Sequence, residues 1–143
     1  MSSPYDAGGP PSGAPGGKTS LGLDSNVGAM LCYIANFLCC LGVILSIVFL
    51  VTEKDNRFVK FHALQSLFLW GACIVLLIAV EILTVFLRIA GLYWISFGVG
   101  WGLWAILILI FAVLWILAGI KANGGQWYKL PGIGGLAFGM VNK

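Results

Sequence analysis

Three long apolar blocks run through this chain, at residues 27–51, 64–87 and 92–120. Each is longer than the roughly 20 residues that an α-helix needs to cross about 30 Å of hydrocarbon. Inside a bilayer every backbone N–H and C=O must find a partner within the chain, and the blocks lack the period of two that barrel strands show. The sequence therefore predicts an all-α integral membrane protein, a helical bundle of three long hydrophobic blocks.

The composition supports the same class. Hydrophobic residues make up 60% of the chain and charged residues 9%, which is far from the balance of soluble domains. The net charge of +3 comes from eight Lys and Arg against five acids, placed mostly at the ends of the blocks. This placement suits contact with anionic headgroups, so we expect the lipid bilayer and no nucleic acid as a partner.

The predicted organisation has three parts. Residues 1–25 hold four of the five prolines and six glycines, which favours a disordered tail rather than a secretory signal. Residues 26–121 form the transmembrane bundle. Residues 122–143 are rich in glycine and are expected to lie along the interface, with too many helix breakers for a further span.

The first block leaves two alternatives open. It contains Asn36, the pair Cys39 and Cys40, and Gly42 near its middle. It can form one tilted helix, or it can break near Gly42 into a re-entrant pair of short helices, which gives four membrane segments. In the second case the N-terminus joins the side that holds seven of the eight cations.

The cations predict the orientation. The turn between the second and third blocks carries only Arg88, whereas the 52–63 loop and the C-terminus carry clusters of Lys and Arg. Because cationic loops stay in the cytoplasm, we expect the 52–63 loop and the C-terminus to be cytoplasmic, in the cytoplasmic (inner) membrane.

Glu81 is the one acid within a hydrophobic block. A charged carboxyl at that depth costs a few kcal/mol, so it should be protonated, face protein or water, or pair with a cation. Arg88, seven residues later on the same face, is its natural partner. A structural polar contact and an ion or proton pathway both remain open for this pair.

A stripe of small residues follows one face of the third block. Such a face lets helix backbones approach closely, which is how helices associate in lipid. The helix that packs on it can belong to the same chain, to a second copy in a homo-oligomer, or to other membrane subunits. The residues are Gly91, Gly98, Gly102, Ala105, Ala112 and Gly119.

The segment that opens the second block concentrates the remaining chemistry. Gln65 cannot stay unpaired at that depth, and we expect it to bond another helix or backbone exposed by a break near Gly42. An interfacial helix start with a positive-inside signal is the simpler alternative to a functional site. The candidate residues are Phe58, Lys60, Phe61, His62, Gln65 and Ser66.

Enzyme chemistry has little support in the sequence. It holds one histidine and no paired carboxylates, phosphate loop or zinc motif. The four cysteines lie in apolar blocks and are expected to be small buried hydrophobes. We therefore expect no catalytic residues, no cofactor and no metal.

The run from Phe58 to Ser66, F-V-K-F-H-A-L-Q-S, resembles the signature of a family of small bacterial and archaeal membrane proteins. That family is similar to the channel-type subunit of the plastid inner-envelope (Tic) translocon and to the magnetosome membrane proteins MamF and MmsF. Looser landmarks lie at 19–23, at 122–127 and at Pro131. The resemblance implies a compact helical bundle with three or four membrane segments, and most members have no assigned activity.

Two functions remain open. The protein can be a non-enzymatic subunit of a membrane complex that assists the movement of peptides or solutes. It can instead be a structural or organising membrane protein that recruits partners without transport. The blocks offer few polar side chains, so a hydrated pore within one monomer is not expected.

Overall fold

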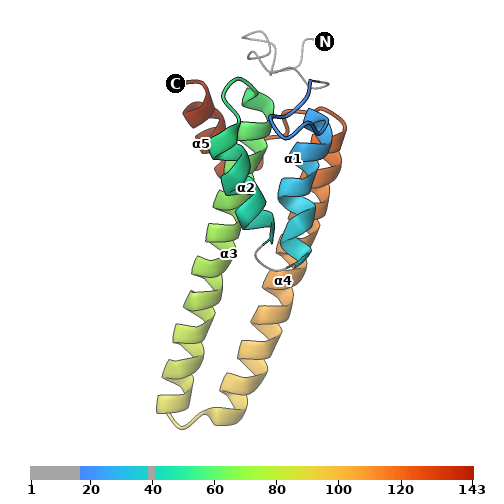
Figure 1. Ribbon diagram of the computed structural model, residues 1–143. Helices are drawn as coiled ribbons and strands as arrows, with labels where there is room; N and C mark the ends of the chain where they lie inside the picture. Colours follow the sequence, from blue (N-terminus) through green and yellow to red (C-terminus); the bar gives the residue numbers. More distant parts are fainter. Residues whose placement is uncertain (1–16, 39–40) are drawn as a thin grey trace, which may run out of the picture.

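The computed structural model describes residues 17–38 and 41–143. In order, it contains α1 (Ser25–Ile34), a short 3-10 helix η1 (Ala35–Leu38), α2 (Leu41–Thr52), α3 (Arg57–Ile89), α4 (Tyr93–Asn123) and α5 (Ile133–Val141) (Figure 1). No β-sheet occurs within these two described ranges. The prediction of an all-α fold is confirmed.

The first apolar block is divided into two short helices. α1 and α2 lie on either side of residues 39–40 and run in opposite directions, so that their outer ends meet at the same end of the molecule (Figure 1). Gly42 lies so close to the side chain of Asn36 that any Cβ there would collide with it. Of the two alternatives, the chain adopts the broken block, while Cys39 and Cys40 themselves lie outside the described residues.

α3 and α4 form a long antiparallel hairpin. With 33 and 31 residues, they are about 50 Å and 46 Å long at 1.5 Å per residue. The turn between them contains Gly91 at φ +79°, a left-handed conformation that glycine adopts without strain. α1, α2 and α5 pack around one half of this hairpin, and we call that half together with α1 and α2 the head (Figure 1). Residues 78–108 continue beyond α1 and α2, and we call them the distal hairpin.

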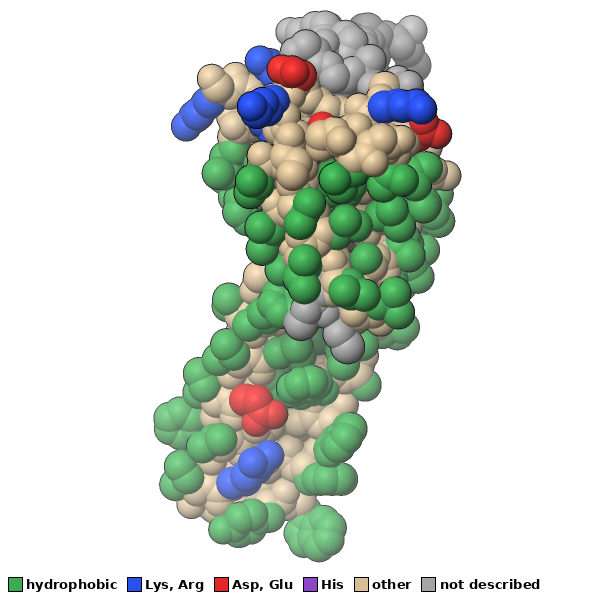
Figure 2. All heavy atoms as spheres, in the orientation of Figure 1, with side chains coloured by type: hydrophobic (Ala, Val, Ile, Leu, Met, Phe, Trp, Pro, Cys, Tyr) green, Lys and Arg blue, Asp and Glu red, His purple; other side chains and the backbone are tan. Residues whose placement is uncertain are grey.

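The outer surface of the long hairpin is apolar. In the most apolar stretch of α3 and of α4, only 17% of the residues are buried, and on the two helices Val75 and Leu109 are 65% and 66% exposed. The core helix of a soluble protein would bury such side chains, so this surface suits a lipid environment. Figure 2 shows charged side chains at the head and one further charged patch on the distal hairpin.

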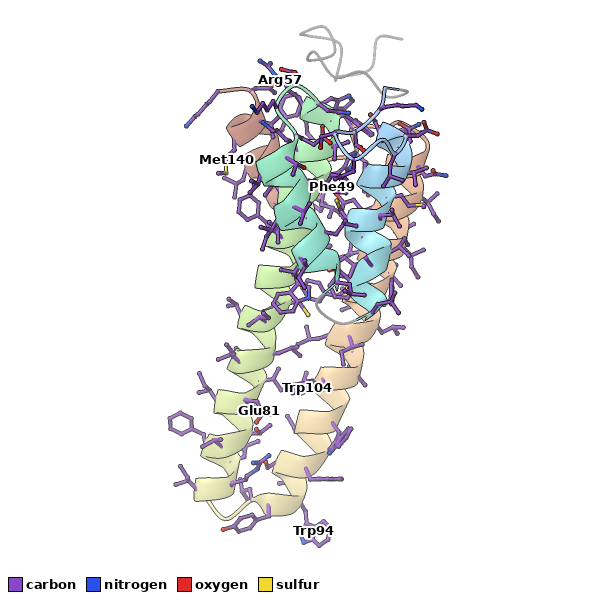
Figure 3. All side chains as sticks on the ribbon, viewed as in Figure 1. Phe49, Arg57, Glu81, Trp94, Trp104 and Met140 are labelled. Atoms are coloured by element: carbon purple, nitrogen blue, oxygen red, sulfur yellow. The ribbon has the colours of Figure 1, made fainter. Side chains whose placement is uncertain are left out.

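The head core is built from aromatic and small side chains of α1, α2, α3 and α4. Tyr33, Phe49 and Phe58 are fully buried there, together with Ala118 and Ala122 of α4. Phe49 of α2 lies between α2 and α1 (Figure 3), and a Cβ on Gly28 of α1 would lie 3.3 Å from its ring. Close packing around small residues therefore holds the short helices against the long ones.

Part of the predicted disordered tail is folded. Residues 1–16 lie outside the described residues, but 17–24 form a loop over the ends of α1 and α2. Buried Glu53 accepts hydrogen bonds from the backbone N–H of Ser20, at 2.6 Å, and from its hydroxyl, at 2.9 Å. The hydroxyl of Ser25 donates to the carbonyl of Gly17 at 2.7 Å. These bonds to the bundle offset the ordering entropy that the loop could not offset alone.

The glycine-rich C-terminal segment contains a further short helix. After an extended stretch it forms α5, which begins behind Gly132 at φ +80°. Gly134 and Ala137 are buried against the head. A nine-residue helix is too short to be stable alone, so packing of its small-residue face on α3 stabilises it despite its three glycines.

Candidate functional site

The segment from Phe58 to Ser66, which we call the hinge, takes part in a hydrogen-bond network at the centre of the head. Tyr33 of α1 and His62 of α3 are fully buried, and the Tyr33 hydroxyl lies 3.0 Å from His62 Nδ1. His62 Nε2 lies 3.1 Å from the carbonyl oxygen of Gln126. A carbonyl can only accept, so Nε2 carries the proton and Nδ1 accepts from the tyrosine hydroxyl. Both ring nitrogens are thus occupied by protein partners.

Gln65 fastens the segment after α4 to α3. Its side-chain nitrogen donates to the Tyr33 hydroxyl at 2.9 Å and to the carbonyl of Tyr128 at 3.0 Å. Its side-chain oxygen accepts from the backbone N–H of Leu130 at 3.2 Å. Gln65 thus bonds another helix, α1, as expected, and its backbone partners are Tyr128 and Leu130 rather than residues near Gly42.

Ser66 makes the connection toward the break in the first block. Its hydroxyl donates to the carbonyl of Cys32 at 2.6 Å and accepts from the side-chain nitrogen of Asn36 at 3.0 Å. Asn36 also donates to the Cys32 carbonyl at 3.1 Å. The last turn of α1 is therefore held by side chains, where its own helical hydrogen bonds end.

Phe58 and Phe61 of α3 build an aromatic cluster around His62. Both lie edge-on to the histidine ring, with centroids 4.6 Å and 4.8 Å away. The same two rings contact Trp127, each at 5.3 Å, and Phe61 also meets Phe138 of α5 at 6.0 Å. These contacts exclude water from the hydrogen-bond network and bind α5 to the head.

Lys60 is the one hinge candidate that takes part in none of the hydrogen bonds and ring contacts described above. It is half-buried, and its Nζ donates to the carbonyl of Lys54 at 3.2 Å, across the loop before α3. Asn56 caps the same helix by accepting from the N–H of Val59. The structure thus brings five of the six hinge candidates together, and their partners are internal.

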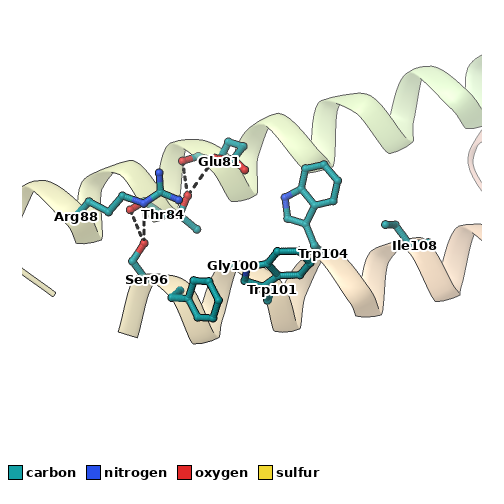
Figure 4. A pocket seen from close by; sticks show the side chains of 9 residues that line it. Glu81, Thr84, Arg88, Ser96, Gly100, Trp101, Trp104 and Ile108 are labelled. Atoms are coloured by element: carbon teal, nitrogen blue, oxygen red, sulfur yellow. Dashed lines mark hydrogen bonds between the residues drawn. The ribbon is translucent and has the colours of Figure 1, made fainter. Parts of the chain in front are cut away.

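Glu81 and Arg88 lie in a second polar place, a cleft of about 540 Å³ between α3 and α4 of the distal hairpin (Figure 4). No ion pair joins Arg88 to Glu81 among the described residues, and their pairing stays a prediction. Arg88 Nε instead donates to Ser96 Oγ at 3.2 Å, and Ser96 donates to the carbonyl of Thr84 at 3.0 Å. The partner of Arg88 is thus the hydroxyl group of Ser96 on the neighbouring helix α4.

The small-residue stripe of the third block is split between two surroundings. Gly119 is buried against Tyr33 and Ile34 of α1, and a Cβ there would lie 3.2 Å from Ile34. Gly98 and Gly102 are exposed, with open space where a side chain would begin. The remaining members are Gly91 and Ala105, which are exposed, and Ala112, which is half-buried. The packing role of the exposed part stays a prediction.

Sequence reasoning missed several residues that hold these sites. Tyr33 and Glu53 are buried polar anchors, and their position inside or beside an apolar block was the available signal. Ser96 and Gly100 meet Thr84 across the hairpin, and a Cβ on Gly100 would lie 2.9 Å from a Thr84 methyl group. Only the folded hairpin brings these positions together.

Comparisons with known proteins give the chain its relatives. The family model for the magnetosome magnetite crystal formation protein family, MamF_MmsF, matches residues 24–137. The chain is 40% identical over 121 residues to a UPF0132 membrane protein of Methanocaldococcus jannaschii, which covers 85% of this chain and 92% of the relative. A second such protein of that organism is 30% identical over 118 residues, or 82% of this chain and 71% of the relative.

A UPF0132 membrane protein of Archaeoglobus fulgidus is 33% identical over 115 residues, which covers 80% of this chain and 93% of that protein. No solved structure matches the chain significantly. These names describe membrane proteins and indicate no catalytic activity. They do not describe translocon components, so the likeness to the Tic subunit stays a prediction.

Proposed function

We propose that this chain, which belongs to the magnetosome magnetite crystal formation protein family, is a small multi-pass membrane protein without catalytic activity that organises other membrane components. The main support for the proposal is that the polar side chains of the hinge are bonded within the protein. His62, Gln65 and Ser66 form hydrogen bonds with other residues of the chain, whereas the exposed surface of the long hairpin is apolar. The hinge thus builds a rigid head, and the outer faces remain for lipid and partners.

The topology that we propose has both long helices crossing the bilayer. α1 and α2, with 10 and 12 residues, are about 15 Å and 18 Å long, so each reaches only about half of a 30 Å hydrocarbon layer. They enter and return on the side of the head. With the re-entrant pair, seven of the eight cations lie on that side, which we assign to the cytoplasm.

A transport role finds less support in the described residues. The polar groups of the head and the distal cleft are separated along the bundle by Leu69, Cys73 and Phe111, which are buried. A single chain therefore offers no continuous polar path through its described residues, and a transporting assembly would need further copies or subunits. The archaeal relatives are described only as membrane proteins, so we do not propose a role in crystal formation for this chain.

Association has a specific surface. On α4, helical periodicity puts Gly98, Gly102 and Ala105 opposite the face that carries Ser96 and Gly100 toward α3. A smooth face of this kind accepts a helix of another copy or another membrane protein at short distance. We propose it as the surface through which the protein recruits partners.

Two measurements test this proposal. Cysteines introduced at Lys18, Asp55 and Trp94 are probed with a membrane-impermeant maleimide in intact cells and in inverted vesicles, with the parent chain as baseline. We expect the first two to react only from the cytoplasmic side and the third only from the other. Labelling of Lys18 and Asp55 positions from opposite sides would contradict the re-entrant pair.

The second measurement is crosslinking followed by mild-detergent purification. Gly102→Leu with Ala105→Leu should lose the co-purifying copies or partners, while Ile110→Leu, an exposed change on the same helix, should keep them. Unchanged association in the double variant would refute the recruiting surface. Solute or peptide flux through vesicles that hold the purified protein alone would favour transport instead.

A further inference from the structure

The distal cleft holds the carboxyl group of Glu81 and the guanidinium of Arg88, and no ion pair joins them among the described residues. The Thr84 hydroxyl lies 2.9 Å from the Glu81 backbone carbonyl and 3.3 Å from its carboxylate, so its single proton bonds the carbonyl better. The Arg88 guanidinium reaches Ser96 through Nε only. Figure 4 shows these bonds, and both Glu81 and Arg88 line the cleft.

This arrangement leaves hydrogen-bonding capacity at both charges. A carboxylate accepts at about four lone-pair sites, and a guanidinium has five N–H donors. Because this capacity is only partly used, a ligand that brings the complementary charges can form charge-assisted hydrogen bonds to both groups. The complement of Glu81 beside Arg88 is an ammonium group next to an anionic group.

The depth of the cleft points to a lipid headgroup. About 30 Å of hydrocarbon corresponds to about 20 helical residues. Counted from Lys60 at the head, such a length brings α3 to Glu81; counted back from Lys121, it brings α4 to Trp101. Both residues line the cleft. If α3 and α4 cross the bilayer as proposed above, the cleft lies at the level of the headgroups on the side away from the head.

The walls of the cleft suit an amphiphile. Phe97, Trp101 and Ile108 line it and are 63%, 69% and 50% exposed. Trp104 also lines it, and its indole N–H is buried without a hydrogen-bond partner. An indole face attracts an ammonium group, and the free N–H can donate to a phosphate or ester oxygen. Exposed apolar side chains of the hairpin continue from the cleft as a surface for acyl chains.

We propose that the cleft between Glu81 and Arg88 binds the headgroup of a zwitterionic phospholipid, with its ammonium at the Glu81 carboxylate and its phosphate at the Arg88 guanidinium. A free zwitterion such as an amino acid shares this charge pattern. The position at headgroup depth and the apolar walls favour the lipid. The inference rests on the proposed crossing of the bilayer by α3 and α4.

The test uses the full chain in mild detergent with phosphatidylethanolamine, phosphatidylcholine or phosphatidylglycerol, and native mass spectrometry reads the lipid retained. We expect phosphatidylethanolamine to be retained at least about tenfold more than phosphatidylglycerol, since one charge-assisted hydrogen bond is worth that much in affinity. Phosphatidylcholine should lie between the two, because its trimethylammonium group attracts the carboxylate but has no N–H to donate. Glu81→Gln should abolish the preference, and Arg88→Gln should weaken retention of all three lipids. Asp55→Asn and Arg57→Gln, exposed charges at the head, are the matched controls.

Equal retention of the three lipids, or unchanged retention in both cleft variants, would overturn the inference. Glycerophosphoethanolamine, the headgroup without acyl chains, distinguishes the sources. If it shifts the Trp104 indole N–H resonance at concentrations as low as the lipid does, the ligand is a soluble zwitterion and the lipid assignment is wrong. Carbonate-resistant flotation of the protein with vesicles tests membrane insertion separately, so a protein that floats but shows no lipid preference contradicts this inference alone.

Discussion

Replacing Gln65 by leucine should release the C-terminal segment from the head. Gln65 is fully buried, and leucine has nearly its volume, so the change removes hydrogen bonds and leaves the packing. Two backbone groups lose their partner, the carbonyl of Tyr128 and the N–H of Leu130, while the Tyr33 hydroxyl keeps its bond to His62.

The expected cost follows from these two groups. A buried donor or acceptor left without a partner costs about 1–3 kcal/mol, so the pair gives about 2–6 kcal/mol. Values measured in membranes fall toward the lower end, because the unfolded chain also finds partners there. We therefore expect the free energy of unfolding to fall by about 2–3 kcal/mol.

The assay is unfolding by sodium dodecyl sulfate from mixed micelles, followed by circular dichroism, together with hydrogen exchange of the Leu130 amide. Gln126→Leu is the matched control: the same chemical change at an exposed side chain should alter stability by no more than about 0.5 kcal/mol. If Gln65→Leu matches this control in stability, and the Leu130 amide remains equally protected, the proposed fastening role of Gln65 is wrong.

Three further predictions concern close contacts and the N-terminal loop. Gly134→Ala places a Cβ 2.5 Å from the backbone of the loop before α5, so limited proteolysis should cut that loop faster; Gly135→Ala, which meets open space, should not change the rate. Gly100→Ala places a Cβ 2.9 Å from a methyl group of α3 and should lower the free energy of unfolding by about 1–3 kcal/mol, whereas Gly98→Ala should be neutral or slightly stabilising. Glu53→Ala removes the acceptor of two hydrogen bonds from the loop at 17–24, and amide exchange in that loop should accelerate with little change in the bundle.

Some properties of the site followed from single residues in the sequence. A buried amide must be hydrogen-bonded, so Gln65 was correctly expected to need partners inside the bundle. Its partners could not be foreseen, because residues 126–130 carry no pattern that aims their backbone at α3. The same applies to Arg88, whose hydroxyl partner Ser96 lies beyond the hairpin turn.

The sequence alone also did not decide whether the first block is one helix or two. Asn36, two cysteines and Gly42 marked a weak point in an apolar run, but a tilted helix and a bent pair bury similar apolar surface. The choice depends on polar contacts that the sequence does not place next to one another: Ser66 holds Asn36, and Asn36 fills the space beside Gly42.

The sequence by itself determined the class of this protein, because long apolar runs can satisfy their backbone groups in lipid only as helices. It also located the hinge residues and the one acid within an apolar block, since polar side chains stand out against an apolar background. Tertiary structure alone decided which partners these polar groups have and which faces of α4 are covered. Hydrogen bonds and close packing depend on positions to within about an ångström, and these are set by how helices far apart in the chain come together.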